Sequence, residues 1–194
     1  MKTDIILAGV GGQGILSIAA TIGTAAINLG LHIKQAETHG MSQRGGDVQS
    51  HFRLSDKPIA SDLIPFGKAD LILSVEPMES LRYLPYLSPE GWLITNAKRL
   101  VNIPNYPPVE EVMEAIRNTK NHIVIDAMKV ARDIGNSKAA NIVMLGAASR
   151  FIGIEYQELE KALHTIFIRK GEEVVKANIE ALKAGREFAD NYQE

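Results

Sequence analysis

The sequence predicts an α/β protein: a three-layer α/β/α sandwich with a mixed but mostly parallel sheet and a helical C-terminal extension. Short apolar runs that end in glycine or in a polar residue recur along the chain, as buried strands do. Apolar residues with helical spacing stand between them, and the pattern of the C-terminal part is almost wholly helical. At 194 residues, the chain is long enough for one such domain, residues 1–194, and short for two.

The first predicted unit is a strand, a tight turn and a helix. Residues 5–8 are apolar and too few for an independent helix, and a glycine-rich turn follows them. From Ile15 to Leu29 the apolar residues gather on one helical stripe, which stops at Gly30. Residues 31–37 predict a second strand. We therefore expect a right-handed β-α-β unit whose two strands pair in parallel.

The next segment departs from that pattern. Residues 38–47 have no apolar period and predict a loop in place of a crossover helix. Residues 48–54 alternate, with Val48, Ser50, Phe52 and Leu54 facing one way and Gln49, His51 and Arg53 facing the other. This period of two predicts a strand with one wet or interfacial face.

The rest of the chain predicts three more strands and a series of helices. The strands are expected at residues 71–75, 92–95 and 122–125, and a proline-rich loop at residues 97–108. The helices are expected at residues 77–87, 109–116, from about 127, and at about 137–152, 156–167 and 171–190.

Composition excludes several classes of function. The chain has 21 Lys and Arg against 23 Asp and Glu, so it has no overall basic field to hold nucleic acid. It has no cysteine, which removes disulfides, thiolate metal sites and iron–sulfur clusters held by this chain alone. The start of the chain has neither the length nor the flanks of a signal peptide or a membrane span, so we expect a cytoplasmic protein with no membrane partner.

Gly9, Gly11, Gly12, Gln13 and Gly14 lie in a G-x-G-x-x-G motif between the first strand and the first helix, as in Rossmann-like folds. Without side chains there, a ligand can approach backbone N–H groups at the helix start, which favours a phosphate or another anion. The alternative is that the glycines only allow a tight turn and close packing of the helix on the sheet.

Polar residues end several predicted strands and would meet at one edge of a parallel sheet: Gly9, Glu37, Glu76, Asn96 and Asp126. Glu37 stands where a dinucleotide fold places the acid that binds ribose. A free-standing NAD(P)-binding oxidoreductase is therefore an alternative, although the segment after Glu37 lacks the expected helix and the chain has little room for a substrate domain. For Glu76 and Asp126 we favour a role as helix caps.

The loop Ser42, Gln43, Arg44, Gly45, Gly46 contains a second candidate site. Glycines beside Arg44 allow a sharp bend, and a guanidinium there can form bidentate hydrogen bonds to a phosphate or carboxylate. The alternative is a solvated arginine on an exposed loop. The five histidines show no paired metal-ligand spacing, and no Ser–His–Asp order or nucleophile elbow is present. No metal site is predicted, and the sequence identifies no catalytic residue.

Three motifs together resemble one family. ILAGVGGQGIL at residues 6–16, ETHGMSQRGG at residues 37–46 and SVEP at residues 74–77 are similar to the gamma-type subunit of 2-oxoacid:ferredoxin oxidoreductases. Within that family the chain is most similar to the small (beta) subunits of the indolepyruvate enzymes. The likeness covers about residues 4–190 in length and motif order, and the joint occurrence of the two glycine motifs is more specific than either alone.

The resemblance implies a function that composition alone does not indicate. In that family an assembled enzyme decarboxylates a 2-oxoacid on thiamine diphosphate, transfers the acyl group to coenzyme A and passes electrons through iron–sulfur clusters to ferredoxin. It implies that thiamine diphosphate and the clusters lie on a partner alpha subunit, that coenzyme A is a possible co-substrate, and that the isolated chain is inactive. The residues that match are the Gly11–Gly14 turn and the Gln43–Gly46 loop.

A non-catalytic interaction module is a further alternative. Such a module would use the Gln49, His51 and Arg53 face and the C-terminal helix as docking surfaces. A homodimer is expected when the partner is missing, because a surface built for a subunit interface leaves apolar area exposed.

Overall fold

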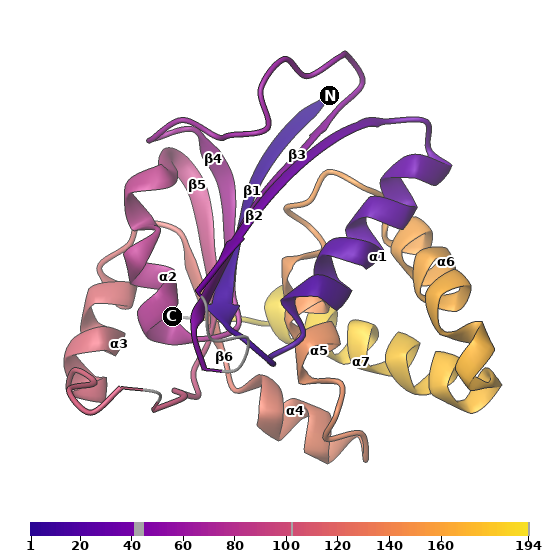
Figure 1. Ribbon diagram of the computed structural model, residues 1–194. Coiled ribbons are helices and arrows are strands. Elements are labelled where there is room, and N and C mark those ends of the chain that lie inside the picture. Colours follow the sequence, from indigo (N-terminus) through magenta and orange to yellow (C-terminus); the bar gives the residue numbers. More distant parts are fainter. Residues whose placement is uncertain (41–44, 102, 194) are drawn as a thin grey trace.

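A six-stranded sheet forms the middle layer of the molecule, in the order β2-β3-β1-β4-β5-β6. The computed structural model describes residues 1–40, 45–101 and 103–193. Helices α2 and α3 cover one face of the sheet, and α1, α4, α5, α6 and α7 lie on the other (Figure 1). The strands are β1 (Lys2–Val10), β2 (His32–His39), β3 (Asp47–Ser55), β4 (Ala69–Ser74), β5 (Leu87–Asn96) and β6 (His122–Ile125).

The helices follow the predicted order. They are α1 (Ile15–Asn28), α2 (Pro77–Arg82), α3 (Val109–Arg117), α4 (Ala127–Asp133), α5 (Ala140–Ala148), α6 (Tyr156–Phe167) and α7 (Glu172–Asp190), with short 3-10 turns η1 (Leu84–Tyr86) and η2 (Ile168–Lys170). The three-layer architecture and the mixed sheet are thus confirmed, with parallel pairs β1–β4, β4–β5 and β5–β6.

The predicted parallel pairing of the first two strands is wrong. β3 lies between β1 and β2 and is antiparallel to both, so that His51 stands opposite Ile6 on one side and Ala36 on the other. The reason is the missing crossover helix, since two strands joined by a short loop can only return as an antiparallel hairpin. β2 consequently forms the sheet edge beside β3, one strand away from the glycine turn.

Alternate residues of β1 supply the two halves of the core. Ile5 and Leu7 belong to the cluster that contains α1 and α5, whereas Ile6 and Ala8 pack with the cluster that contains α3. All four side chains are fully or almost fully buried. This two-sided burial explains why the strand is a continuous apolar run rather than an alternating one.

The predicted helix at residues 77–87 is wrong beyond Arg82. After Tyr83 the chain continues as the 3-10 turn η1, and β5 begins at Leu87. Pro85 is the physical cause, because proline has no N–H to donate and its ring clashes with the carbonyl four residues earlier in an α-helix. The predicted helix at 137–152 is also shorter, running over Ala140–Ala148.

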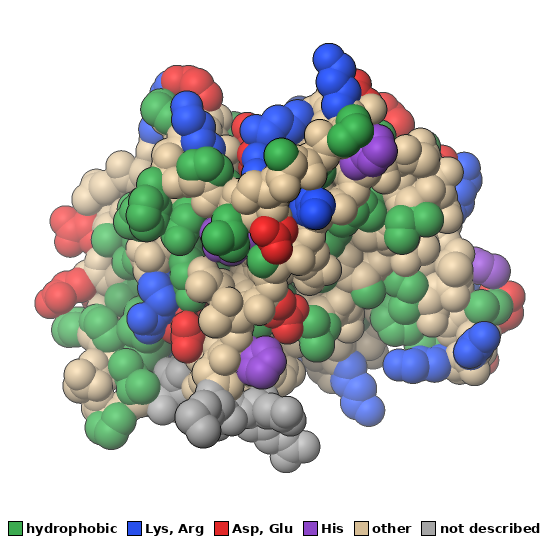
Figure 2. Space-filling model, turned by 45° about the horizontal axis from the view of Figure 1, so that its top comes forward, with side chains coloured by type: hydrophobic (Ala, Val, Ile, Leu, Met, Phe, Trp, Pro, Cys, Tyr) green, Lys and Arg blue, Asp and Glu red, His purple; other side chains and the backbone are tan. Residues whose placement is uncertain are grey.

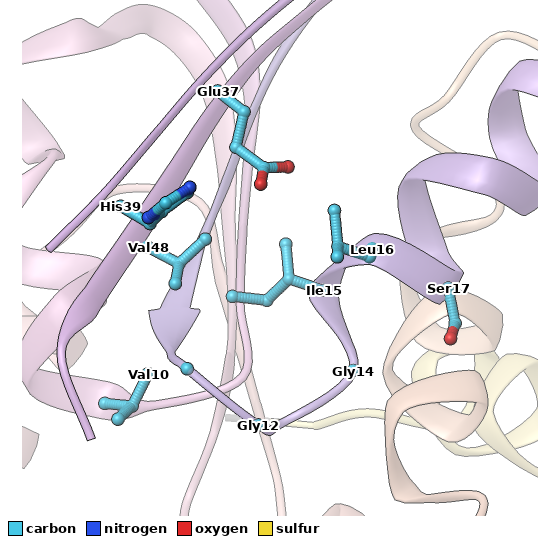
Figure 3. A pocket seen from close by; sticks show the side chains of 10 residues that line it. Val10, Gly12, Gly14, Ile15, Leu16, Ser17, Glu37, His39 and Val48 are labelled. Carbon is cyan, nitrogen blue, oxygen red and sulfur yellow. The ribbon is translucent and has the colours of Figure 1, made fainter. Parts of the chain in front are cut away.

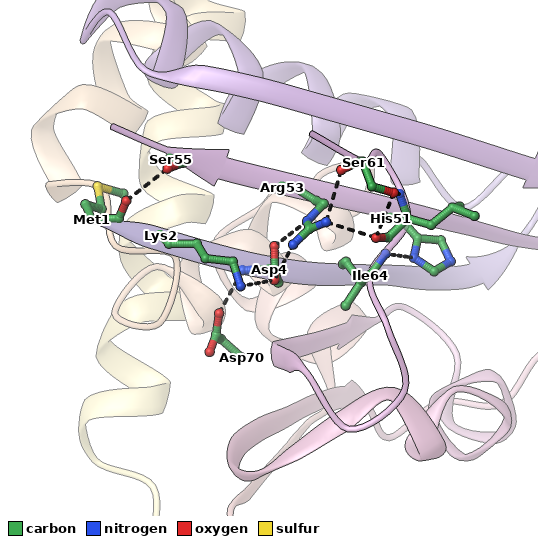
Figure 4. A network of polar contacts seen from close by, with 10 residues as sticks. Met1, Lys2, Asp4, His51, Arg53, Ser55, Ser61, Ile64 and Asp70 are labelled. Atoms are coloured by element: carbon green, nitrogen blue, oxygen red, sulfur yellow. Dashed lines mark hydrogen bonds and ion pairs between the residues drawn. The ribbon is translucent and has the colours of Figure 1, made fainter. Parts of the chain in front are cut away.

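The predicted wet face of residues 48–54 is wrong as well. Residues 56–68 cover it, since Arg53 donates hydrogen bonds to the carbonyls of Ser61 and Leu63, and His51 accepts one from the N–H of Ile64 (Figure 4). The side chain of His51 is buried, and only a small part of that of Arg53 reaches solvent. At His51 and Arg53, this face is therefore not available for docking.

The surface of the molecule is mixed in sign. On the face shown in Figure 2, basic and acidic side chains are interspersed among apolar ones, in keeping with a formal net charge of -2. Within the described ranges, no helix is long and apolar enough to cross a lipid bilayer.

Candidate functional site

The glycine turn between β1 and α1 has a backbone that favours glycine. Gly12 and Gly14 have φ angles of 99° and 84°, in the left-handed region. A Cβ atom at Gly12 would point into open space, whereas one at Gly14 would press on the side chain of Asn141. Asn141 also donates a hydrogen bond to the Gly14 carbonyl at 3.2 Å, which ties the turn to the start of α5.

The two predicted glycine segments lie together. The N–H of Gly11 donates to the carbonyl of Gly46 at 2.8 Å, and the N–H of Gly45 donates to the carbonyl of Gly11 at 3.3 Å. The antiparallel β2–β3 hairpin brings this about, because its tip returns to the edge of the sheet at which β1 ends. Three further predicted residues, Ser42, Gln43 and Arg44, lie outside the described residues.

Only some of the N–H groups of the turn are available to a ligand. Those of Gly11 and Gln13 are already used, the second by the carbonyl of Val10 at 3.2 Å. Within the described part of the chain, the N–H groups of Gly12, Gly14 and Ile15 have no acceptor. The first turn of α1 has no side-chain cap and no acidic residue, so the positive end of the helix dipole is not neutralised there.

A pocket of about 510 Å³ opens beside these groups, between α1 and the ends of β2 and β3 (Figure 3). It is lined by Val10, Gly11, Gly12, Gly14, Ile15, Leu16, Ser17, Glu37, His39 and Val48. Glu37 therefore does lie near the glycine turn, although its strand is not adjacent to β1. Among the described residues, the lining is largely apolar and contains no lysine or arginine, so a bound anion would rely on backbone N–H groups.

Gly9 and Gln13 are not among the described residues that line the pocket. A Cβ at Gly9 would collide with the side chains of Val75 and Ile15, so this glycine serves close packing. The side chain of Gln13 accepts a hydrogen bond from the N–H of Val10 at 2.8 Å and donates one to the carbonyl of Val75 at 3.4 Å. Sequence reasoning placed Gln13 at the site, but not in this role.

The other residues at the strand ends hold neighbouring segments in place. Glu76 caps α2 by accepting from the N–H of Glu79, and Asp126 caps α4 by accepting from the N–H of Lys129, which confirms the predicted caps. Asn96 donates to the carbonyl of Val75 and accepts from the N–H of Ala127. These side chains therefore shape the carboxyl edge of the sheet, and none of them is among the described residues that line the pocket beside the glycine turn.

A buried acidic cluster on α2 was missed by sequence reasoning. The fully buried carboxylate of Glu76 also accepts from the N–H of Leu100 and from the hydroxyl of Tyr106 at 2.6 Å. Burial, and then the hydrogen bond to Glu76, raise the pKa of Tyr106. Burial likewise raises the pKa of the Glu79 carboxyl, although Arg82 opposes the rise. No spacing in the sequence brings these residues together, because loop 97–108 folds back over α2.

Tyr83 links this cluster to the glycine hairpin. Its hydroxyl donates to Asp47, which directly follows Gly46, at 3.2 Å. Burial, and then the charge of Asp47, raise the pKa of Tyr83. Over residues 1–40, 45–101 and 103–193, no three His, Asp or Glu side chains gather as metal ligands.

Comparison with known proteins gives a consistent picture. The family model for pyruvate ferredoxin/flavodoxin oxidoreductase matches residues 4–188. A protein of Thermococcus kodakarensis named indolepyruvate oxidoreductase subunit IorB is 35% identical over 190 residues, which cover 94% of this chain and 93% of that protein.

Solved structures have the same fold. The pyruvate oxidoreductase subunit PORC of Thermotoga maritima superposes with a TM-score of 0.73 at 24% identity, covering 96% of each chain. The 2-oxoglutarate:ferredoxin oxidoreductase of Magnetococcus marinus, solved with 2-oxoglutarate, coenzyme A and succinyl-CoA bound, gives a TM-score of 0.77 at 22% identity. The match covers 99% of this chain but only 32% of that larger chain.

Proposed function

This chain belongs to the pyruvate ferredoxin/flavodoxin oxidoreductase family and is a subunit of a 2-oxoacid:ferredoxin oxidoreductase, and we propose that its substrate is indolepyruvate or a related aryl pyruvate. The reaction is oxidative decarboxylation of the 2-oxoacid to an acyl-coenzyme A, with the electrons passed to ferredoxin. The observation that carries the choice of substrate is the 35% identity, over nearly the whole of both chains, to a subunit named for indolepyruvate.

The redox and decarboxylating cofactors belong, in this proposal, to a larger partner subunit. Iron–sulfur clusters are held by cysteine thiolates, with histidine as an occasional substitute, and this chain has no cysteine. Its donor set therefore does not fit a cluster. We assign thiamine diphosphate to the same partner subunit, as membership of this family implies.

Coenzyme A is the co-substrate that the glycine turn suits best. In the proposal, the available N–H groups of Gly12 and Gly14, together with Arg44, hold an anionic part of coenzyme A or of a partner carboxylate. The apolar wall formed by Ile15 and Leu16 favours contact with an uncharged part of the same ligand. Glu37 lies across the pocket and disfavours a second phosphate there.

Reconstitution tests the assignment. The purified chain and the larger subunit are assayed separately and together for ferredoxin reduction that depends on indolepyruvate and coenzyme A. We expect turnover only from the mixture, because neither half holds a complete site. Full activity of the isolated chain, or equal activity of the larger subunit without it, would contradict the proposal. Phenylpyruvate, pyruvate and 2-oxoglutarate, assayed in parallel, test the aryl preference.

Arg44→Ala tests the anion site. We expect a rise in the KM for coenzyme A of about ten- to a hundredfold, or a comparable weakening of assembly, because one charge-assisted contact to an anion contributes about 1.5–3 kcal/mol. The matched control is Arg117→Ala, an exposed arginine on α3 far from the glycine turn. An unchanged KM together with an unchanged yield of complex would remove Arg44 from the site.

The proposal extends to assembly and location. We place the complex in the cytoplasm, with ferredoxin meeting it on the larger subunit, and we treat residues 1–194 as one domain. Without its partner, the chain is proposed to pair with itself, which sedimentation over a range of concentrations would show; a monomer at all concentrations would refute this part.

A further inference from the structure

The boundary between β1 and β4 is the place where an open α/β sheet usually admits a long ligand. α1 leaves β1 toward one face of the sheet, whereas α2 follows β4 on the opposite face (Figure 1). Dinucleotides bind across such a boundary because the departing loops leave a crevice between the two strand ends. The G-x-G-x-x-G turn stands on one side of this boundary, so the crevice is where an NAD-like ligand would have to cross.

Here a side chain bridges that crevice. The Gln13 amide joins the two strand ends, since its oxygen accepts from the N–H of Val10 and its nitrogen donates to the carbonyl of Val75. The Gln13 oxygen also lies 3.2 Å from the place where a Cβ of Gly9 would be. From the next strand, Asn96 donates to the same Val75 carbonyl at 3.3 Å, so a continuous polar seam runs from the turn to β5.

The pocket beside the turn stops at this seam. The described residues that line it come from the glycine turn, the first turn of α1, the end of β2 and the start of β3 (Figure 3). Within the described residues, β4, β5 and β6 contribute nothing to its wall. A ligand that continued from this pocket across the boundary between β1 and β4 would have to displace the Gln13 amide. The Val10 N–H would then lose its Gln13 acceptor, and the Val75 carbonyl would keep only the Asn96 donor.

We infer that Gln13 is a specificity-determining residue: its amide closes the crevice between β1 and β4, confines the ligand to the β2 side of the glycine turn, and so excludes dinucleotides. This deepens the proposed function, because it limits what the glycine-turn site binds. Its test needs neither coenzyme A nor the larger subunit, so the two proposals can fail separately.

Thiol labelling measures the closure directly. Because the chain has no cysteine, Val75→Cys provides a single thiol at the crevice, and its modification by a maleimide can be compared in the Gln13 and Gln13→Ala backgrounds. We expect labelling about tenfold faster, or more, after Gln13→Ala, since a buried thiol reacts only when uncovered. Ser17→Cys, on the pocket side, is the reference and should react equally in both backgrounds. Equal rates for Cys at position 75 would overturn the inference.

Ligand exclusion is measured on the natural sequence. NADH titration followed by fluorescence should give no saturation with the unaltered chain, and a dissociation constant below about 100 μM would overturn the inference whatever the labelling shows. Near-ultraviolet circular dichroism and thermal melting check that Gln13→Ala is folded. Gln13→Ser, which replaces the amide by a shorter hydroxyl that can still accept a hydrogen bond, is the second variant if Gln13→Ala does not fold. It should also speed labelling of the thiol at position 75, and unchanged labelling there would count against the closure.

Discussion

Arg53 shows how one buried side chain holds a whole segment. Its guanidinium binds the fully buried carboxylate of Asp4 through two hydrogen bonds of 2.7 and 3.0 Å, and its remaining nitrogen donates to the carbonyls of Ser61 and Leu63 (Figure 4). A buried carboxylate that loses its partner is strongly destabilising. Arg53 thus stabilises β1 and the covering segment at the same time.

Arg53→Met should lower the free energy of unfolding by about 3 kcal/mol, the lower end of the usual range for breaking a buried pair. The lower end is expected because Lys2 also contacts Asp4, at 2.6 Å. Urea unfolding measures the change. Lys120→Met is the control, since Lys120 and Glu90 form an exposed pair whose loss costs about 0.5 kcal/mol. A loss below about 1 kcal/mol for Arg53→Met would contradict this account.

His51 makes stability depend on pH. Its ring accepts the N–H of Ile64 at 3.0 Å, which requires an unprotonated Nδ1. Burial, and then the charge of Arg53, lower the pKa of His51 below its ordinary 6.5. The folded protein thus binds fewer protons than the unfolded chain, so the stability contributed by the neutral ring is full above the unfolded pKa and is lost as the pH falls through that range toward the folded pKa.

We therefore expect the urea concentration at the midpoint of unfolding to decrease as the pH is lowered from about 8 to about 5. The decrease should be smaller in His51→Gln. The control is His32→Gln, which replaces an exposed histidine at the start of β2. If His51→Gln keeps the whole pH dependence, another group is responsible for it.

Single residues were predictable where their partners are near in sequence. Glu76 and Asp126 cap the helices that follow them, and a cap needs only the next three residues. Gln13 was placed at the site only because it belongs to the glycine motif. Its hydrogen bond to the Val75 carbonyl was not predictable, because Val75 is 62 residues away. Tyr106 and Glu76 likewise meet only after loop 97–108 has folded over α2.

At the scale of elements, the positions of the strands were predictable but their order was not. Each strand has a local signature of apolar residues and turns, whereas the insertion of β3 between β1 and β2 depends on pairing between distant residues. The missing crossover helix after Glu37 was the relevant signal, because it leaves a hairpin as the simplest connection. The face of β3 was misjudged for a similar reason, since residues 56–68 cover it only in the folded chain.

The crossing of α5 and α7 depends on two glycines. A Cβ at Gly146 would overlap the carbonyl oxygen of Leu182, and one at Gly185 would overlap that of Val143. Gly146→Ala should therefore destabilise the protein by about 2–3 kcal/mol, because the helices must move apart.

Gly23→Ala in α1 is the matched control for that crossing. Its Cβ would meet Phe52 at an ordinary 3.6 Å, and alanine is the better helix former by about 0.5–1 kcal/mol. The midpoint of thermal or urea unfolding should thus decrease for Gly146→Ala and increase for Gly23→Ala. Equal effects would show that the close approach of α5 and α7 contributes nothing.

At the scale of the whole molecule, the resemblance seen in the sequence is confirmed, as is the α/β class. The family model covers residues 4–188, and the relative from Thermococcus kodakarensis matches nearly the full chain. Three motifs sufficed because their order and spacing are more specific than any one glycine motif. The pocket itself was not predictable, since it needs the position of β2 relative to α1.

The lack of cysteine gives a prediction for the whole chain. Incubation with iron and sulfide under reducing, anaerobic conditions should leave no cluster on the purified protein, because cluster assembly requires thiolate ligands. Iron and acid-labile sulfide analyses after gel filtration measure this, with the larger subunit as the positive control. Stoichiometric iron and sulfide on the isolated chain would contradict the assignment of the clusters to the partner.

The β2–β3 hairpin, finally, bears on how such proteins diversify. Its tip contacts the glycine turn through backbone atoms of Gly11, Gly45 and Gly46, while the side chains that fill the core lie farther along its strands. Hairpin tips tolerate changes of length and composition better than the elements they connect. Substitutions at Gly45 or Gly46 can thus change the contacts with the glycine turn, and with them the shape of the pocket, while leaving the core of the sheet intact.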